Sequence, residues 1–312
     1  MAKTVRVALL GCGMWGRNIA RNLHELESLA AVADADMTQA AAFADTFDCP
    51  TLSVEEALQS DAVDAVAIVT SAPSHHDLVT RALRAGKPVF VEKPLALSLE
   101  EAEAIADVST KTGIPVVVGH LIRYHAAFEA MLDLIRNGEI GDLKHIRASR
   151  LAPGRIRDTE SALYDLCPHD LALIAALTGE ETPSRVHAHA ISHITPGIDD
   201  IVTAQLEFSS GVTASVQANW YNPVKIHNLT LIGTTAALVG KEERRQKTRN
   251  PDLLGRFGDT LRNIVVAVLA LVGTEALAAW PFVRNELVAS MAKTAAPGII
   301  DVLGLMRLAQ IP

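Results

Sequence analysis

The stretch VRVALLGCGMWG, residues 5–16, decides the fold of this chain. It predicts a buried strand that ends in a G-x-G-x-x-G turn and continues as a helix. In such a turn one glycine permits a tight bend, one lets a pyrophosphate approach the backbone, and one packs the helix against its strand. The helix N-terminus then faces the phosphates, although the turn alone is not diagnostic, because similar turns occur in methyltransferases and in loops that bind nothing. The cofactor-binding candidates here are Gly11, Gly13, Met14, Trp15 and Gly16.

A second apolar run, residues 29–33, ends in Asp34. This acid stands about 20 residues beyond the turn, where a carboxylate accepts hydrogen bonds from the ribose hydroxyls of a dinucleotide. It would repel the 2′-phosphate of NADP, and no arginine follows closely to compensate, so Asp34 favours NAD over NADP. The alternative interpretation is a solvated strand end, or a cap for a helix that starts near Met37.

Length, charge and cysteine content restrict the class of protein. A chain of 312 residues favours about two domains. The formal net charge of −8 argues against a nucleic-acid partner, because the phosphate backbone favours a basic face. Cys12, Cys49 and Cys167 have neither metal-ligand spacing nor a disulfide pattern, and the N-terminal apolar run is too short for a secretory signal. We therefore expect a cytoplasmic protein.

One apolar stretch, residues 264–283, suggests a membrane span, which needs about 20 apolar residues. Glu275 and Pro281 interrupt it, so we expect a buried helix pair or a contact between subunits of a homodimer or homotetramer instead. The basic stretch 241–249 predicts a solvated loop, with a mobile clamp on an anionic substrate as the alternative.

The N-terminal part of the chain predicts a parallel sheet. Apolar runs at 63–69, 88–91 and 114–118 each follow a helical stretch, and they are continuous rather than alternating. Strands that are covered on both faces have this pattern. We expect an α/β protein whose residues 1–120 form a doubly wound Rossmann domain.

The pattern changes after an expected helix at 126–136. Apolar and polar residues alternate strictly over 212–220, as in a strand with one buried and one wet face, and 184–193, 201–208 and 227–232 are similar. Residues 121–312 are therefore expected to form an α+β domain on a mostly antiparallel open sheet. We expect this domain to bind the substrate and to form the oligomer.

Two segments carry groups suited to acid–base chemistry. Lys93 follows a predicted parallel strand and precedes Pro94, which would hold it extended at the sheet edge where ligands bind. There it can stabilise negative charge on a substrate oxygen, or it can be a surface lysine in a turn. Asp165 and His169 stand four apart on a predicted helix that starts near residues 163–166, has Pro168 in its first turn and stops at Gly179. His169 can accept a hydroxyl proton and Asp165 can orient it, or the two can be a core histidine and a helix cap.

The order of these motifs resembles the glucose-fructose oxidoreductase and inositol dehydrogenase (Gfo/Idh/MocA) family, over most of the chain to about residue 240. The resemblance implies a nicotinamide-dependent oxidoreductase in which Lys93, Asp165 and His169 are catalytic. Residues 69–73 followed by His76 resemble the family's loop beneath the nicotinamide, and residues 138–141 resemble its turn into the second domain. We expect Ser71, His76, Glu92 and Lys93 to join the glycines and Asp34 in binding the cofactor.

The substrate expectation rests on residues 149–157, which resemble family members that act on a ring carbon of nucleotide-linked sugars. Arg155 and Arg157 could pair with a diphosphate in bidentate fashion, with Tyr164 nearby, or they could line a solvated strand edge. The last sixty residues do not resemble the family's usual ending. His187, His189 and His193 are expected to lie on a wet strand face rather than bind a metal.

Two other functions stay open. A reductase of a non-sugar carbonyl or imine would tolerate the loss of Asp165 or His169. A non-catalytic regulatory or scaffold protein would bind the dinucleotide and use its apolar C-terminal segment as a docking surface. Binding alone, however, would not require an acid–base group.

Overall fold

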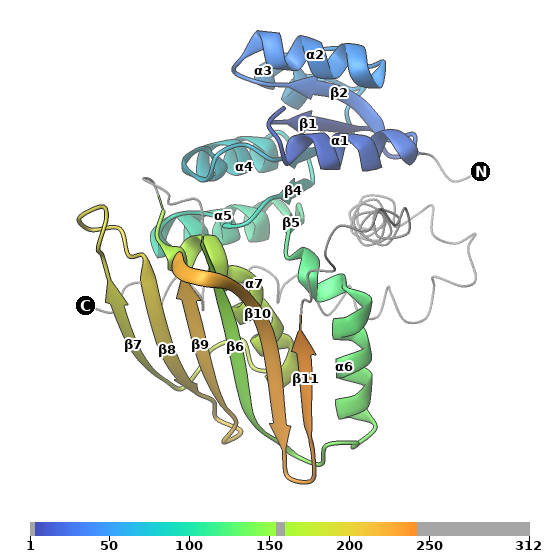
Figure 1. Ribbon diagram of the computed structural model, residues 1–312. Coiled ribbons are helices and arrows are strands. Elements are labelled where there is room, and N and C mark those ends of the chain that lie inside the picture. The colour runs from blue at the N-terminus through green and yellow to red at the C-terminus, as the bar shows by residue number, and fades with distance from the viewer. Residues whose placement is uncertain (1–3, 154–159, 242–312) are drawn as a thin grey trace, which may run out of the picture. The chain divides into compact units, whose positions relative to one another are not determined.

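The computed structural model describes residues 4–153 and 160–241. They fall into two compact units that meet in the sequence between Gly119 and His120. Each unit is built on a sheet of its own (Figure 1). The basic stretch from residue 242 on and the apolar stretch 264–283 lie outside the described residues. Within the described part, no helix has the length and apolar character that a membrane crossing needs.

The first unit contains a five-stranded parallel sheet with the order β2-β1-β3-β4-β5. Chain order runs outward in both directions from the pair β1 and β3, which is the doubly wound arrangement. The strands consist almost entirely of buried apolar residues, as the continuous apolar runs predicted. The strands are β1 (Val7–Leu10), β2 (Leu29–Ala33), β3 (Ala65–Ile68), β4 (Val89–Val91) and β5 (Val116–Val118).

Three of the helices of this unit begin at capping side chains. Asp36, rather than Asp34, caps α2, because its carboxylate accepts the N–H of Thr38 at 2.9 Å. Ser53 and Glu56 form a capping box at α3, and Gly113 ends α5 at φ 69°. The helices are α1 (Gly16–Glu25), α2 (Met37–Phe47), α3 (Val54–Gln59), the short 3₁₀ turn η1 (Ala72–Ser74), α4 (His75–Arg84) and α5 (Leu99–Thr112).

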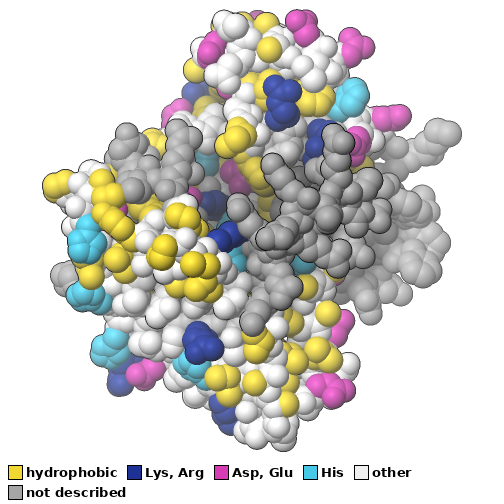
Figure 2. Space-filling view, viewed as in Figure 1, with side chains coloured by type: hydrophobic (Ala, Val, Ile, Leu, Met, Phe, Trp, Pro, Cys, Tyr) yellow, Lys and Arg dark blue, Asp and Glu magenta, His cyan; other side chains and the backbone are white. Residues whose placement is uncertain are grey.

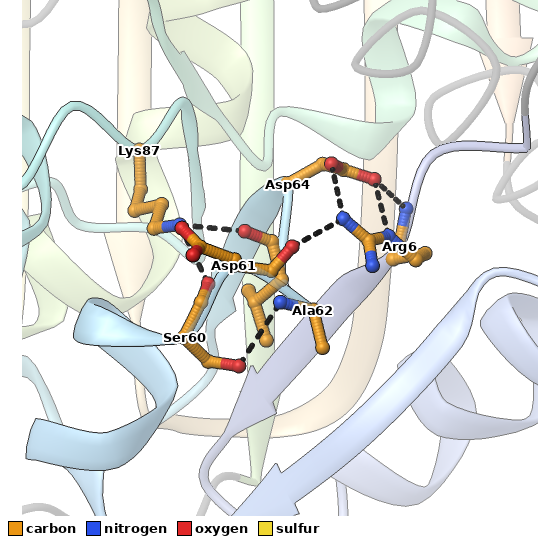
Figure 3. A network of polar contacts seen from close by, with 7 residues as sticks. Arg6, Ser60, Asp61, Ala62, Asp64 and Lys87 are labelled. Carbon is orange, nitrogen blue, oxygen red and sulfur yellow. Dashed lines mark hydrogen bonds and ion pairs between the residues drawn. The ribbon is translucent and has the colours of Figure 1, made fainter.

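A polar network joins the amino ends of three strands (Figure 3). The guanidinium of Arg6, just before β1, donates to both carboxylate oxygens of Asp64, just before β3, each at 2.9 Å. Lys87, just before β4, donates to the carbonyls of Ser60 at 2.9 Å and Val63 at 2.6 Å. Ligands of such sheets bind at the carboxyl edge, and this network lies at the opposite, amino edge. Its role is therefore to stabilise the fold.

The second unit contains a six-stranded sheet with the order β11-β10-β6-β9-β8-β7. Only β6 and β9 pair in parallel, so the prediction of a mostly antiparallel sheet is confirmed. The elements are the 3₁₀ turn η2 (Leu121–Tyr124), α6 (Ala126–Arg136), β6 (Leu143–Pro153), α7 (Ala162–Thr178), β7 (Arg185–Ile191), β8 (Ile201–Glu207), β9 (Thr213–Asn219), β10 (Tyr221–Gly233) and β11 (Ala237–Lys241).

Helix α7 covers one face of this sheet and makes its core. It contacts β6, β8 and β9, and Figure 1 shows it behind the strands. The buried residues of β9 alternate with wetter ones, so Ala214, Val216 and Ala218 face the core. Gly179 ends α7 in the left-handed region at φ 70°, as predicted.

Three details differ from the sequence-based expectations. Helix α7 begins at Ala162, so Pro168 lies inside the helix rather than in its first turn, and the helical bond from residue 168 to the Tyr164 carbonyl cannot form. Strand β7 ends at Ile191, which leaves His193 off the strand. Strands β6 and β11 were not expected, because neither shows a regular two-residue apolar pattern.

Candidate functional site

The glycine-rich turn has two glycines that the fold itself requires. Gly11 has φ 108°, and a Cβ there would lie 2.6 Å from the carbonyl group of Val69. A Cβ on Gly16 would collide with the carbonyl oxygen of Gly11. At Gly13, in contrast, no atom of the described residues lies within 4 Å of the Cβ position. A ligand can therefore approach the backbone closely at Gly13, as the binding of a pyrophosphate requires.

Asp34 connects the end of β2 to this turn. Its Oδ2 accepts the N–H of Cys12 at 2.6 Å, and its Oδ1 accepts the N–H of Asp36 at 2.8 Å. The carboxylate is half-buried, and each oxygen keeps a second lone pair for a ribose hydroxyl. The next residues bring a second carboxylate at Asp36 and no cation. This donor and acceptor set fits NAD, and it fits the extra phosphate of NADP poorly.

The thiol of Cys12, within the same turn, is not expected to react. It is buried, and burial raises its pKa to about 12. The thiol therefore stays protonated at neutral pH, and the turn acts through its backbone rather than through a thiolate.

Two of the cofactor candidates lie at the start of α4 and before it. Ser71 is exposed and His76 is half-buried. The adjacent His75, which sequence reasoning missed, is buried, and its Nδ1 and Nε2 lie 2.7 Å and 3.1 Å from the carbonyl oxygens of Pro94 and Thr70. His75 thus bridges the carboxyl ends of β3 and β4. Neighbouring histidines in a sequence give no signal of which one the fold buries.

Glu92 and Lys93 follow β4 directly. The Glu92 side chain is buried, and its Oε1 accepts the indole N–H of Trp15 at 2.7 Å. Burial raises the pKa of Glu92, although the bonds from Trp15 and the Lys93 N–H oppose this. Lys93 is half-buried, and its peptide bond to Pro94 is cis.

In the second unit, α7 presents Tyr164, Asp165 and His169, and all three are half-buried. The spacing of Asp165 and His169 places them one helical turn apart on one face, as expected. Asp165 Oδ2 accepts the indole N–H of Trp220 at 3.2 Å. The ring of His169 also contacts that of His120 edge-to-face, with centroids 6.2 Å apart. Trp220 and His120 were not predicted, because only the folded chain brings them to α7.

A buried ion pair holds α7 to the sheet next to His169. The Nε and Nη2 atoms of Arg150 on β6 donate to the two oxygens of Asp170, at 2.9 Å and 2.8 Å. Both side chains are largely shielded from solvent. Because the contact is bidentate, it fixes the orientation of the helix as well as its distance from β6.

The remaining candidates do not form a site in the described structure. Arg155 and Arg157 lie outside the described residues. Figure 2 shows histidine side chains along the sheet edge that carries β7, where His187 and His189 are exposed. His193 instead contacts the ring of Tyr221, with centroids 5.6 Å apart. Within residues 4–153 and 160–241, no three His, Cys, Asp or Glu side chains are grouped so that they could hold a metal ion.

A doubly wound parallel sheet with this turn and this acid defines a dinucleotide-binding protein, and comparison with known proteins narrows the class. A model described as an oxidoreductase family with an NAD-binding Rossmann fold matches residues 5–120. A second model, the GFO/IDH/MocA C-terminal domain, matches residues 128–239. The chain belongs to the Gfo/Idh/MocA family and is an NAD-binding oxidoreductase, which confirms the resemblance, the fold class and the cofactor.

Individual relatives agree with this assignment. The chain is 32% identical over 216 residues to UDP-N-acetylglucosamine 3-dehydrogenase of Acidithiobacillus ferrooxidans, a match that covers 69% of this chain and 67% of that protein. It is 32% identical over 225 residues to inositol 2-dehydrogenase of Rhizobium meliloti, covering 68% of each. The crystal structure of myo-inositol 2-dehydrogenase from Lactobacillus plantarum has the same fold, with a TM-score of 0.79, 22% identity and coverage of 99% and 97%.

Proposed function

We propose that this protein transfers a hydride between NAD and a ring carbon of a sugar or cyclitol, and that the preferred substrate is a nucleotide-linked sugar. The observation that carries the proposal is the arrangement on α7, where Trp220 holds Asp165 one turn from His169. The named relatives above act on a UDP-linked sugar and on inositol, which are both polyhydroxylated rings. The proposed reaction converts a ring CH–OH group into a ketone, or a ring ketone into CH–OH.

In the proposed reaction, Asp165 and His169 handle the proton and Lys93 stabilises the developing negative charge. In the oxidation direction the substrate hydroxyl loses its proton to a neutral His169, while the hydride leaves the same carbon and a C=O bond forms. Asp165 orients the imidazole and stabilises it once it carries the proton. The Lys93 ammonium stabilises the negative charge that develops on the oxygen. NAD supplies the hydride acceptor, and the first unit binds it through Gly13 and Asp34.

We propose further that residues 1–120 bind the cofactor and that residues 121–312 bind the substrate and form a homodimer or homotetramer. Arg155, Arg157 and Tyr164 are the proposed contacts of the substrate, with the two arginines on its diphosphate. The cysteines support the proposal that the protein works in the reducing cytoplasm, since Cys12, Cys49 and Cys167 are all free thiols.

The test begins with the purified full chain. Bound dinucleotide is released and identified, and a panel of UDP-linked sugars, free sugars and inositols is screened in both directions by the absorbance of the reduced nicotinamide. We expect NAD as the bound species and a higher kcat/KM for a nucleotide-linked sugar than for its free counterpart. Turnover of free rings alone would remove the nucleotide from the proposal. A second panel of imines and non-sugar carbonyls is screened in the same way, and turnover confined to that panel, or no turnover of any ring, would overturn the proposal.

A further inference from the structure

The carboxylate of Glu92, a residue expected among the cofactor contacts, is a buried group that takes no part in the proposed transfer of the hydride and the proton. Only 8% of the residue is exposed, at the carboxyl edge of the first sheet. Three segments surround it. Its Oε1 accepts from Trp15 at 2.7 Å, its Oε2 accepts the N–H of Lys93 at 3.3 Å, and a Cβ on Gly119 would lie 3.0 Å from Oε1. Burying a carboxylate is costly, and the charge of Lys93 and the hydrogen bonds from Trp15 and the Lys93 N–H offset part of that cost. A carboxylate held in this way is suited to positioning the residues that it contacts.

The contacts of Glu92 join the glycine-rich turn to the Lys93 segment. Trp15 is the last residue before Gly16 and α1, so it belongs to the turn that would approach the pyrophosphate. Through its charge-assisted hydrogen bond, a displacement of Trp15 would move Glu92, which in turn accepts the backbone N–H of Lys93. A side chain at position 119 would crowd the carboxylate, so the glycine there leaves the space in which the Glu92 side chain lies.

A second contact fixes the other side of the lysine. His75 Nδ1 lies 2.7 Å from the carbonyl oxygen of Pro94, and its Nε2 lies 3.1 Å from that of Thr70. The buried imidazole thus ties the residue after Lys93 to the end of β3. Lys93 thus lies between two anchored residues, Glu92, which is held by Trp15 of the glycine-rich turn, and Pro94, which is held by His75 at the start of α4.

We propose that Trp15 and Glu92, together with His75, are positioning residues that set the place of the Lys93 amine and couple it to the glycine-rich turn. The inference rests on the proposed function, because it takes Lys93 as the group that stabilises the substrate oxygen. It adds a route by which occupancy of the dinucleotide site acts on that group. Trp15 is 37% exposed, so its ring is accessible to a ligand while its N–H is engaged.

The variants separate the hydrogen bond from the packing. Trp15→Phe keeps an aromatic ring and removes the donor, Glu92→Ala removes the acceptor, and Glu92→Gln keeps an oxygen that can accept from Trp15. The matched control is Asp64→Asn, which neutralises a carboxylate of the same unit at the opposite edge of the sheet. Melting temperatures and NAD affinity, measured by calorimetry, establish that each variant is folded and binds the cofactor.

Two readouts are combined. The first is the rate of reductive methylation of Lys93, followed by mass spectrometry, which needs no substrate. The second is steady-state kinetics, which shows whether a substitution changes kcat, KM or both. We expect Trp15→Phe and Glu92→Ala to change the methylation rate and to lower kcat about tenfold, with KM nearly unchanged, since one hydrogen bond to a charged group is lost. Glu92→Gln should recover part of this loss, and the double variant should be no worse than Glu92→Ala, because both changes break one link.

The outcomes distinguish this inference from the proposed function. An unchanged methylation rate in both variants would overturn the positioning role, whatever the value of kcat. A changed methylation rate with wild-type kcat would support the link between the loops and would instead overturn the role of Lys93 in the reaction. Changes of equal size in Asp64→Asn would also overturn the inference, because they would show a general loss of rigidity.

Discussion

Trp220 donates its indole N–H to Asp165 at 3.2 Å, so a residue between two strands orients the carboxylate on α7. The position of Trp220 is itself well defined. Its side chain is buried, and its backbone N–H donates to the carbonyl of Asp200 at 3.1 Å. The sheet therefore controls the direction of the Asp165 carboxylate, which lies one helical turn from the proposed proton acceptor His169.

Trp220→Phe is expected to lower kcat while most of the packing is kept. The ring stays and the donor is lost, so the Asp165 carboxylate gains rotational freedom at a cost of roughly 1.5–3 kcal/mol for a bond to a charged group. We expect about a tenfold lower kcat and a shifted pH–rate profile. Both are measured by steady-state kinetics from about pH 5 to 9, an interval that includes the range in which histidine titrates. A wild-type profile would remove Trp220 from the catalytic arrangement.

Asp170→Asn is expected to destabilise the second unit strongly. Arg150 and Asp170 form a shielded bidentate pair, and removing one partner of a buried pair costs about 3–5 kcal/mol. The measurement is urea-induced unfolding at equilibrium. The control is Asp107→Asn, which disrupts the exposed pair between Asp107 and Lys111 and should cause no measurable loss. Equal effects of the two substitutions would contradict the structural role of the Arg150 pair.

The stability of Glu92→Gln relative to wild type should depend on pH. Burial raises the pKa of Glu92 in the folded protein above the ordinary value of 4.5, so the folded state binds this proton more tightly than the unfolded state. Its contribution to stability is then full below the unfolded pKa and is lost as pH rises through the folded pKa. Glutamine has no such loss. The free energy of unfolding of Glu92→Gln minus that of wild type should therefore rise from pH 4.5 toward neutrality in denaturant titrations, and a flat or falling difference would be the opposite of this expectation.

Asp34→Asn should weaken the preference for NAD over NADP. The substitution keeps the shape of the side chain but removes the charge that repels a 2′-phosphate and part of the capacity to accept from ribose. We expect the Kd for NAD to rise about tenfold and the ratio of the NADP and NAD constants to fall, measured by calorimetry. Asp45→Asn on the exposed side of α2 is the control. If both variants kept the wild-type ratio, Asp34 would not be the discriminating group.

Much of the first unit could be predicted from the sequence because its signals are local. The run into Gly11, the apolar strand before Asp34 and the turn at Pro94 each lie within a few residues of the structure that they specify. Continuous apolar strands also identify a parallel sheet without knowledge of their partners. Asp34 and Asp36 show the limit of this reasoning, since only the folded chain decides which of two nearby acids caps α2.

The second unit was less predictable because its elements depend on partners that are distant in the sequence. Strand β6 carries Lys, His and Arg side chains and becomes a strand by pairing with both β9 and β10. The contacts of Trp220 with Asp165 and of His120 with His169 join segments about fifty residues apart. Likewise, the start of α7 at Ala162 rather than nearer Pro168 is supported by a backbone bond from Ala162 to the carbonyl of Asp199.

The central claim is that Lys93 and His169 carry out the reaction while the glycine-rich turn and Asp34 bind NAD. It is tested most directly by hydride transfer in Lys93→Ala and His169→Ala, followed as reduced nicotinamide in single turnovers with the ring substrate found in the screen. We predict that each substitution lowers the rate at least about 100-fold, while the Kd for NAD and the rate of the control Lys111→Ala stay near wild type. Wild-type rates in both Lys93→Ala and His169→Ala would contradict the account.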